Sequence, residues 1–287
     1  MAAPRVVLVT GANTGIGYET VKAFLESARS YHVLLGSRDL AKGKEAVAAL
    51  QKELPRIKNT VEVIQVDLTS DESIEKAYEK VKASPGRLDY LVNNAGLFLS
   101  VLSLHLIQTE VITGATFDIE YVAGKVSLRD CFNKAYDVNV AGTNVLTHIF
   151  VPLLLKSSDP RLIFVAGLSQ ISVASVKYFP TPPQPAGWPK KIDFETIGYR
   201  SSKTAMNMVM LDWSHKLKED GVKVWAVGPG FLATNLGNIR DKVLAMGGGH
   251  PSIGGIIIKE VAEGARDEDV GKIVGKGSDG NFKLIPF

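Results

Sequence analysis

Tyr199 and Lys203 are the two side chains whose types and spacing best fit proton-transfer chemistry, in the segment Tyr-Arg-Ser-Ser-Lys. Residues four apart lie on one face of a helix, so a phenol and an ammonium can act in the same small volume. A free tyrosine titrates near pH ~10, so a nearby cation is needed to stabilise the phenolate at neutral pH. A Tyr-x-x-x-Lys pair without other motifs usually just lies on a helix surface. It predicts a catalytic site only together with other motifs.

A second group of residues suited to chemistry is the glycine turn of Gly11, Gly15 and Gly17, directly after the strand-like run 6–9. Apolar residues at helical spacing follow in 18–25, so the segment predicts a strand, a tight turn and a helix start. Such a turn lets backbone N–H groups approach a pyrophosphate, and the helix N-terminus adds the positive end of its dipole. The spacing Gly-x-x-x-Gly-x-Gly is not the usual Gly-x-Gly-x-x-Gly, and alone it fits an ordinary strand-to-helix turn equally well.

Four further motifs stand in order with these two. They are Asp67 after 61–66, Asn93-Asn94-Ala95-Gly96 after 88–92, Asp137-Val138-Asn139-Val140, and Pro229-Gly230-Phe231-Leu232-Ala233-Thr234 after 222–227. With these six motifs the chain resembles a short-chain dehydrogenase/reductase over nearly its whole length. Its inserted loops are similar to those of carbonyl-reductase-like members, which include biosynthetic reductases of bulky natural-product ketones.

The elements that must position these motifs alternate between strands and helices. Strands are predicted near 5–10, 31–36, 61–66, 88–93, 161–166, 222–227 and 281–285, and helices at about 15–28, 39–54, 71–83, 127–156, 199–219 and 252–264. This alternation predicts an α/β fold, a doubly wound parallel sheet with helices on both faces and a ligand crevice at the carboxyl ends of the strands. Residues 1–287 are expected to form a single NAD(P)-binding Rossmann domain.

The resemblance implies the catalytic roles. Tyr199 protonates the carbonyl oxygen as hydride arrives at carbon, and it works in reverse for alcohol oxidation. Lys203 stabilises the phenolate and binds the nicotinamide ribose, while Asn139 holds a water that links the lysine to bulk solvent. For Asn139 a role as a helix-kink residue is the alternative.

One position departs from the family pattern. The fifth strand normally ends in a serine that hydrogen-bonds the substrate carbonyl, and here Ala166 and Gly167 stand in its place. Losing one such donor can cost about 3–4 kcal/mol of transition-state stabilisation, so a replacement is needed for efficient reduction. Ser169 lies on the same strand face if the strand extends and is expected to supply the hydroxyl, with Ser172 a weaker candidate. Alternatively, Ser169 only satisfies hydrogen bonds of the loop.

The end of the second strand predicts the cofactor. An NAD site uses an acid about 20 residues beyond the glycines, whereas an NADP site uses an arginine near the extra phosphate. Arg38 stands where that phosphate is expected, Ser37 can donate a hydrogen bond, and Lys42 adds charge one helical turn later. Asp39 could contact a ribose, but it is better explained as the N-cap of the next helix. The segment therefore favours NADPH.

The resemblance implies further cofactor contacts. Asp67 contacts the adenine, Asn94 and the backbone at Ala95 and Gly96 the ribose region, and Thr234 the nicotinamide carboxamide or the phosphates. The full set of predicted cofactor-binding residues is Gly11, Asn13, Thr14, Gly15, Ile16, Gly17, Ser37, Arg38, Lys42, Asp67, Leu68, Asn94, Ala95, Gly96, Tyr199, Lys203, Pro229, Gly230, Leu232 and Thr234.

Two long connections interrupt the alternation and are expected to emerge beside the nicotinamide end of the crevice. They are the inserted segments of about 97–126 and 170–198. Long connections inside a compact domain are usually functional or disordered. The second is proline-rich, and its Phe179 and Trp188 are expected to form a substrate wall. A solvent-exposed loop, or a Pro-x-x-Pro segment that binds a partner, is the alternative.

Composition excludes several classes of protein. The 287 residues carry a net charge of +3 and are 45% hydrophobic and 22% charged, with basic residues spread along the chain, which gives little support to nucleic-acid binding. Cys131 is the single cysteine, so there is no internal disulfide, and neither it nor the five histidines show metal-ligand spacing. No stretch approaches the roughly 20 apolar residues of a membrane span, and a cytoplasmic location is the default. A homo-oligomer stays open.

These patterns together predict an NADPH-dependent reductase of a small-molecule ketone or aldehyde, with a natural-product pathway as one setting. An NADP-binding sensor or scaffold with little redox activity is the main alternative, and the glycine at 167 favours it. A non-redox isomerase or cyclase on the same fold is the other.

Overall fold

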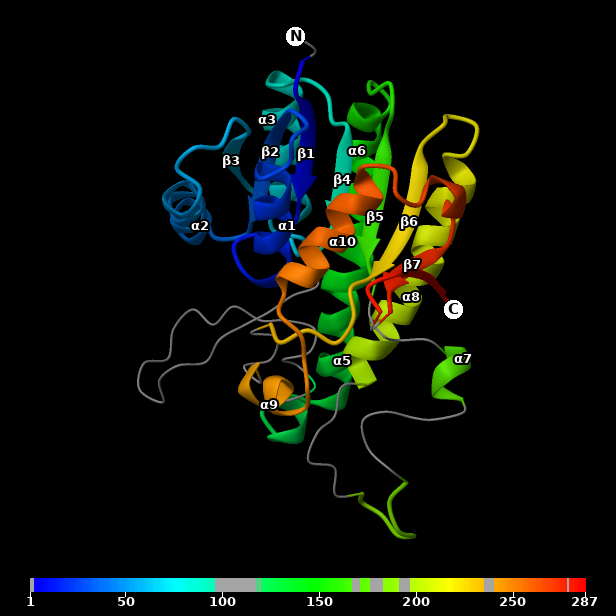
Figure 1. Cartoon of the computed structure of the whole chain (residues 1–287). Coiled ribbons are helices and arrows are strands. Elements are labelled where there is room, and N and C mark those ends of the chain that lie inside the picture. The colour runs from blue at the N-terminus through cyan, green and yellow to red at the C-terminus, as the bar shows by residue number, and fades with distance from the viewer. Residues whose placement is uncertain are drawn as a thin grey trace.

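The computed structural model describes residues 3–95, 118, 120–166, 171–175, 183–190, 197–234, 240–277 and 279–287. Within these residues the strands form a single sheet surrounded by helices (Figure 1). The strands are β1 Arg5–Val9, β2 Tyr31–Ser37, β3 Thr60–Gln65, β4 Tyr90–Asn93, β5 Arg161–Val165, β6 Lys223–Gly228, β7 Ile273–Lys276 and β8 Phe282–Ile285.

The sheet order is β3-β2-β1-β4-β5-β6-β7-β8. All neighbours pair in parallel except β7 and β8, which are antiparallel. Strand order reverses between β1 and β4, and in a doubly wound sheet this switch point opens the ligand crevice. The predicted α/β doubly wound fold is confirmed. Two details were wrong, because β7 was not predicted and the last strand runs antiparallel. The four residues of β7 include Gly275 and form too short a run for a period to show.

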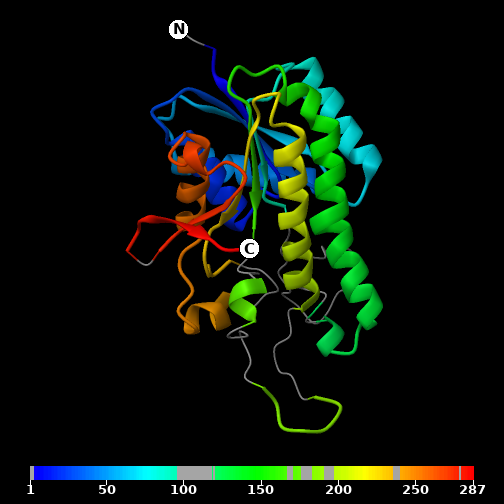
Figure 2. The same ribbon diagram turned by 90° about the vertical axis from the view of Figure 1, so that its right-hand side faces the viewer.

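Helices cover both faces of the sheet (Figure 2). Helices α1, α2 and α10 pack on one face, and α3, α6 and α8 pack on the other. The helices are α1 Gly15–Leu25, α2 Leu40–Glu53, α3 Asp71–Ala83, α5 Leu128–Tyr136, α6 Thr143–Leu154, α7 Ile171–Ala174, α8 Ile197–Lys216, α9 Arg240–Ala245 and α10 Ser252–Ala262, with a 3-10 turn at Asp267–Asp269.

The central strands supply both cores, one on each side of the sheet. In β1, Val6 and Leu8 belong to the core under α3, α6 and α8, whereas Val7 and Val9 belong to the core under α1, α2 and α10. Successive side chains of a strand point to opposite faces, so a strand buried on both sides reads as a continuous apolar run. This explains why the run 6–9 could be recognised as a strand.

The predicted helix 127–156 is interrupted by a π-helical turn. Residues Asp137–Gly142 form this turn (η1) between α5 and α6. At Gly142 a Cβ atom would overlap the carbonyl oxygen of Leu68, so only glycine allows the turn to approach the loop after β3 so closely. Single π turns inside α-helices often occur at functional sites, and this one contains Asn139.

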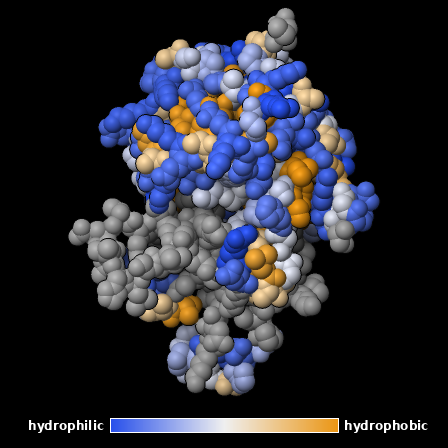
Figure 3. Space-filling model, turned by 60° about the vertical axis from the view of Figure 1, so that its left-hand side comes forward, coloured by the Kyte–Doolittle hydropathy of each residue, from blue (hydrophilic) through white to orange (hydrophobic). Residues whose placement is uncertain are grey.

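On the face shown in Figure 3, hydrophilic residues predominate among the described ones. Figure 3 shows polar side chains over most of one face, with small hydrophobic areas between them. Among the described residues, no helix is both long enough and apolar enough to cross a membrane.

Candidate active site

Helix α8 brings Tyr199 and Lys203 together at the carboxyl end of β5. The Lys203 side chain is buried, and its Nζ lies 5.9 Å from the centroid of the Tyr199 ring. The same Nζ donates a hydrogen bond of 3.0 Å to the carbonyl oxygen of Val165, the last residue of β5. The helix therefore places the phenol and the ammonium in one volume, as the four-residue spacing predicts.

Burial dominates the acid–base properties of both groups. Removal from water raises the pKa of Tyr199 to about 12 and lowers the pKa of Lys203 to about 8. Each shift disfavours the charged form, as expected for desolvation. With this pKa, Tyr199 is a protonated phenol at neutral pH, the form that a proton donor requires. The stabilisation of its phenolate by Lys203 stays a prediction.

Asn139 lies beside this pair and is tied to it through Ser202. The Asn139 Nδ2 donates to the Ser202 hydroxyl over 2.8 Å, and that hydroxyl donates to the carbonyl oxygen of Tyr199 over 2.7 Å. The Asn139 Oδ1 is buried and accepts no hydrogen bond from the described residues. A buried acceptor of this kind normally has a partner, so it is a suitable place for the predicted water. The water itself stays a prediction.

A buried carboxylate that the sequence analysis missed touches the start of the same helix. Asp118 is fully buried, and its two oxygens accept hydrogen bonds from the backbone N–H groups of Gly198 (2.7 Å) and Tyr199 (2.8 Å). The Sγ of Cys131 lies 3.5 Å from Asp118 Oδ1. No sequence signal marked Asp118, because it lies 81 residues from Tyr199, inside the segment 97–126 that was assigned to the substrate wall.

The glycine turn has the shape of a phosphate cradle. Gly11 and Gly15 have φ of +60° and +59°, in the left-handed region that favours glycine. A Cβ at Gly11 would lie 2.9 Å from the Cα of Ala95, and one at Gly17 would lie 2.5 Å from the Nδ2 of Asn94. Thr14 is the N-cap of α1, and its side chain makes no capping hydrogen bond to the N–H groups of the first turn. These N–H groups are suited to bind an anion, so the turn fits the predicted pyrophosphate site.

Asn94 connects this turn to β4. Its Nδ2 donates to the carbonyl oxygens of Thr10 (2.8 Å) and Gly11 (3.2 Å). In return, the Thr10 hydroxyl accepts from the backbone N–H groups of Asn94 and Ala95 at 3.1 and 2.9 Å. The amide of Asn94 therefore shapes the turn, and the predicted ribose contact stays a prediction.

The end of β2 supports the predicted assignment of Asp39. Its Oδ1 accepts from the backbone N–H groups of Ala41 (2.8 Å) and Lys42 (3.1 Å), so the carboxylate caps α2, as predicted. The Ser37 hydroxyl is buried and donates to the carbonyl oxygen of Asp39, which was not expected. Arg38 is half-buried, and neither it nor the exposed Lys42 forms an ion pair with the described residues. Two cations are thus available where the 2′-phosphate is expected.

The remaining predicted cofactor residues border the same crevice. A Cβ at Gly15 would lie 3.7 Å from the Thr234 side chain, which places the loop after β6 against the glycine turn. Leu232, Ile16 and Pro229 all meet at Gly254 of α10. In the loop after β3, the Asp67 carboxylate accepts hydrogen bonds from the N–H and the hydroxyl of Thr69.

Several predictions lie outside the described residues. These are the contacts of Gly96, the glycine at 167, the donor role of Ser169, most of the segment 97–126 and Phe179. The side chain of Ser172 is likewise not described. Trp188 lies in the described stretch 183–190 and is 87% exposed, so the expectation that it lines the substrate wall is wrong for the structure.

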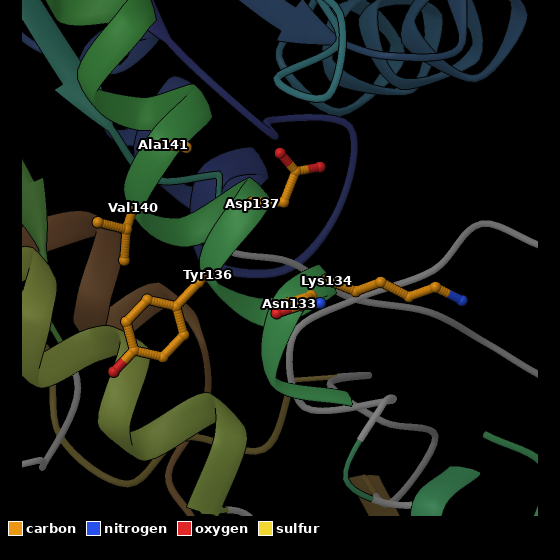
Figure 4. A pocket seen from close by; sticks show the side chains of 6 residues that line it. All are labelled: Asn133, Lys134, Tyr136, Asp137, Val140 and Ala141. Carbon is orange, nitrogen blue, oxygen red and sulfur yellow. The ribbon is translucent and has the colours of Figure 1, made fainter. Parts of the chain in front are cut away.

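A surface hollow is lined by residues of α5 and η1 (Figure 4). Its lining residues are Asn133, Lys134, Tyr136, Asp137, Val140 and Ala141. Burial and the nearby carboxylates of Asp67 and Asp71 raise the pKa of Asp137. The hollow contains neither Tyr199 nor Lys203, so the carbonyl chemistry is not placed there. Within the described residues, no group of three His, Cys, Asp or Glu is placed to hold a metal ion.

Comparison with known proteins supports the family resemblance indicated by the sequence motifs. The family model described as short chain dehydrogenase matches residues 5–180. The short-chain dehydrogenase/reductase tropE of Talaromyces stipitatus is 45% identical over 281 residues, which cover 96% of each chain. The short-chain dehydrogenase/reductase eupG of a Phoma species is 38% identical and covers 93% of each chain. Among solved structures, the NADPH-bound carbonyl reductase from chicken fatty liver aligns over 100% of both chains with a TM-score of 0.70 and 22% identity, a likeness of fold.

Proposed function

Because this chain belongs to the short-chain dehydrogenase family, we propose that it is an NADPH-dependent reductase that transfers hydride to a ketone or aldehyde. One observation supports the proposal most strongly. Asn139 is joined to Tyr199 through Ser202, and Lys203 lies beside the Tyr199 ring and binds the carbonyl oxygen of Val165 at the carboxyl end of β5. In a doubly wound sheet, this is the end where ligands bind.

The residues of this chain divide the work as follows. NADPH, when bound, supplies the hydride. The Tyr199 hydroxyl gives its proton to the carbonyl oxygen as that oxygen becomes negative, which general acid catalysis requires. Lys203 then stabilises the phenolate that is left, since its ammonium lies beside the ring. The phenolate regains its proton from solvent through the predicted water at Asn139.

The preference for NADPH over NADH is supported by charge at the end of β2. Arg38 and Lys42 stand where a 2′-phosphate is expected, and Asp39, the acid that could select NADH, is occupied as a helix cap. The chicken carbonyl reductase of similar fold is itself NADPH-bound. A small-molecule carbonyl compound is the proposed substrate.

A panel of aromatic and aliphatic aldehydes and ketones, which includes 4-nitrobenzaldehyde and bulky polycyclic ketones, tests the activity through the loss of NADPH absorbance. Tyr199→Phe should abolish turnover while the Kd for NADPH stays within about twofold, because the phenol is needed for the proton and little for cofactor affinity. Tyr78→Phe is the matched control, since this tyrosine packs against the core from α3, far from the site. Turnover by Tyr199→Phe near the wild-type rate would place the proton donor elsewhere. NADPH binding without turnover of any compound would favour the sensor or scaffold.

Arg38→Ala tests the cofactor preference. A charge-assisted contact to phosphate contributes about 1.5–3 kcal/mol, so the Kd for NADPH should rise about 10- to 100-fold while the Kd for NADH changes little. Arg56→Ala removes an arginine from an exposed position of the loop before β3 and serves as the control. Equal affinity of the wild type for both cofactors would refute the preference.

A further inference from the structure

We propose that Asp118 is a positioning residue: its carboxylate holds the first turn of α8 and thereby fixes the direction of the Tyr199 phenol. The inference rests on the proposed function, because it concerns how the proton donor is presented.

The carboxylate uses both of its oxygens on this one turn. Oδ1 accepts from the Gly198 N–H and Oδ2 from the Tyr199 N–H, at 2.7 and 2.8 Å. Helix α8 begins at Ile197, so both N–H groups belong to the first turn, where a helix offers no internal acceptor. Hydrogen bonds to an ionised acceptor are about twice as strong as neutral ones.

The surroundings of Asp118 are built for a buried charge. Burying a carboxylate is costly unless it is hydrogen-bonded, and here two N–H groups and the positive end of a 20-residue helix compensate the charge. The adjacent glycine leaves the necessary room. A Cβ at Gly198 would lie 3.0 Å from Cys131 Sγ and 3.1 Å from Asp118 Oδ1. The carboxylate thus fills the space between α5 and the start of α8.

The contacts hold the backbone of Tyr199 at both ends. Its N–H is bound by Asp118, and its carbonyl oxygen accepts from Ser202, which in turn is held by Asn139. Lys203, one turn later, is anchored separately to Val165 at the end of β5. Loss of the Asp118 contact would free the first turn while the lysine stays in place. The phenol would then shift relative to the ammonium.

Asp118→Asn is the sharpest test, because an amide can accept only one of the two hydrogen bonds and its NH₂ would face the other N–H. With NADPH and 4-nitrobenzaldehyde, kcat should fall at least about tenfold, since small displacements of a catalytic group are costly. The Kd for NADPH should stay within about twofold. Ser70→Ala, which removes the side-chain cap of α3, is the control for a merely structural cap and should leave kcat unchanged. A kcat of Asp118→Asn equal to wild type would overturn the proposal.

A second readout does not need turnover. Tyrosine labelled with carbon-13 at Cζ reports each phenol by NMR, and the Tyr199 signal is identified by its absence in Tyr199→Phe. In Asp118→Asn this signal should move or broaden, whereas the signal of Tyr78 should not. An unmoved Tyr199 signal would overturn the inference even if the wild type reduces none of the aldehydes. A moved signal in such an inactive protein would keep the inference and reject the proposed function. If Asp118→Asn does not fold, Asp118→Ser, which retains one acceptor, takes its place with the same expectations.

Discussion

Lys203 is an ionisable side chain that is buried away from solvent. Burial lowers its pKa from the ordinary 10.5 to about 8, and the carbonyl oxygen of Val165 is the acceptor that its ammonium finds on β5. The unfolded chain therefore binds more protons than the folded one between these two pH values, so stability rises as pH increases through this range. At neutral pH the buried charge lowers stability by about 3 kcal/mol. Such a cost is typical of a functional group.

Lys203→Met should therefore stabilise the protein at pH 7 while abolishing reductase activity. Methionine has a similar length and no charge, so the cost of burying the ammonium is removed. The carbonyl oxygen of Val165 then loses its hydrogen bond, which costs about 1–2 kcal/mol. A net increase of about 1–2 kcal/mol in the free energy of unfolding is therefore expected. Urea unfolding at pH 7 measures it, and the gain should shrink as pH rises from 8 toward 10.5. Lys218→Met, at an exposed position just after α8, should change stability little. A Lys203→Met variant less stable than wild type at pH 7 would show that the buried charge of this lysine does not lower stability.

At the scale of elements, α10 fixes the start of α1 and hence the glycine turn. The two helices approach closely because Gly255 has no side chain, and a Cβ there would lie 2.5 Å from the carbonyl group of Glu19. One residue earlier, Gly254 contacts Ile16 of α1, as well as Leu232 and Pro229 of the loop after β6. A single helix thus positions two sides of the predicted cofactor crevice.

Gly255→Ala should destabilise the protein although alanine favours helices by about 1 kcal/mol. The added methyl group overlaps a helix backbone that cannot give way, and overpacking of this kind costs about 1–3 kcal/mol. The NADPH Kd should also rise several-fold, because α1 must shift. Ile256→Ala, on the exposed side of the same helix, is the control for both measurements. Unchanged unfolding and unchanged NADPH binding would contradict the assigned role of α10.

At the scale of the whole molecule, the two ends of the sheet do different work. The carboxyl end of β5 lies beside the proposed catalytic groups, whereas the amino ends of β5 and β6 carry an ion network. There Arg161 and Lys223 pair with Asp159 and Asp267. The Arg161 guanidinium is buried and lies 5.5 Å from the Trp225 ring centroid. The network joins β5 and β6 to the turn before β7, which are far apart in the sequence.

Asp267→Asn should lower the Tm at pH 7 by a few degrees, and the difference should vanish in acid. The hydrogen bond from Arg161 lowers the pKa of Asp267, with a further contribution from Lys223. A lowered carboxyl pKa stabilises the fold above the ordinary value of 3.8 and stops doing so as pH falls through the lowered value. Asp220→Asn, at an exposed turn, is the control. A Tm difference that persists unchanged at the acid end would show that charge is not its cause.

Local patterns were enough to predict much of this protein. The apolar runs of β1 to β6 and the helices that begin with a cap, such as Asp39 for α2, depend on residues close in sequence. The order of the six motifs indicated the family, and the four-residue spacing on α8 indicated the Tyr199 and Lys203 pair. Each of these signals is written within a few residues, so no partner from another part of the chain is needed to recognise it.

Tertiary structure decided the rest, because it depends on which distant groups meet. The π turn at 137–142 follows from close packing of Gly142 on Leu68, and β8 finds its direction only by pairing with β7. Asp118 acquires a role only because the fold brings its carboxylate within hydrogen-bond distance of Gly198, 80 residues further along the chain. The raised pKa of Tyr199 and the lowered pKa of Lys203 could not be predicted from their spacing, because desolvation is set by the whole surrounding core. Sequence determined which groups are present and which elements carry them, whereas packing determined their water exposure and their partners.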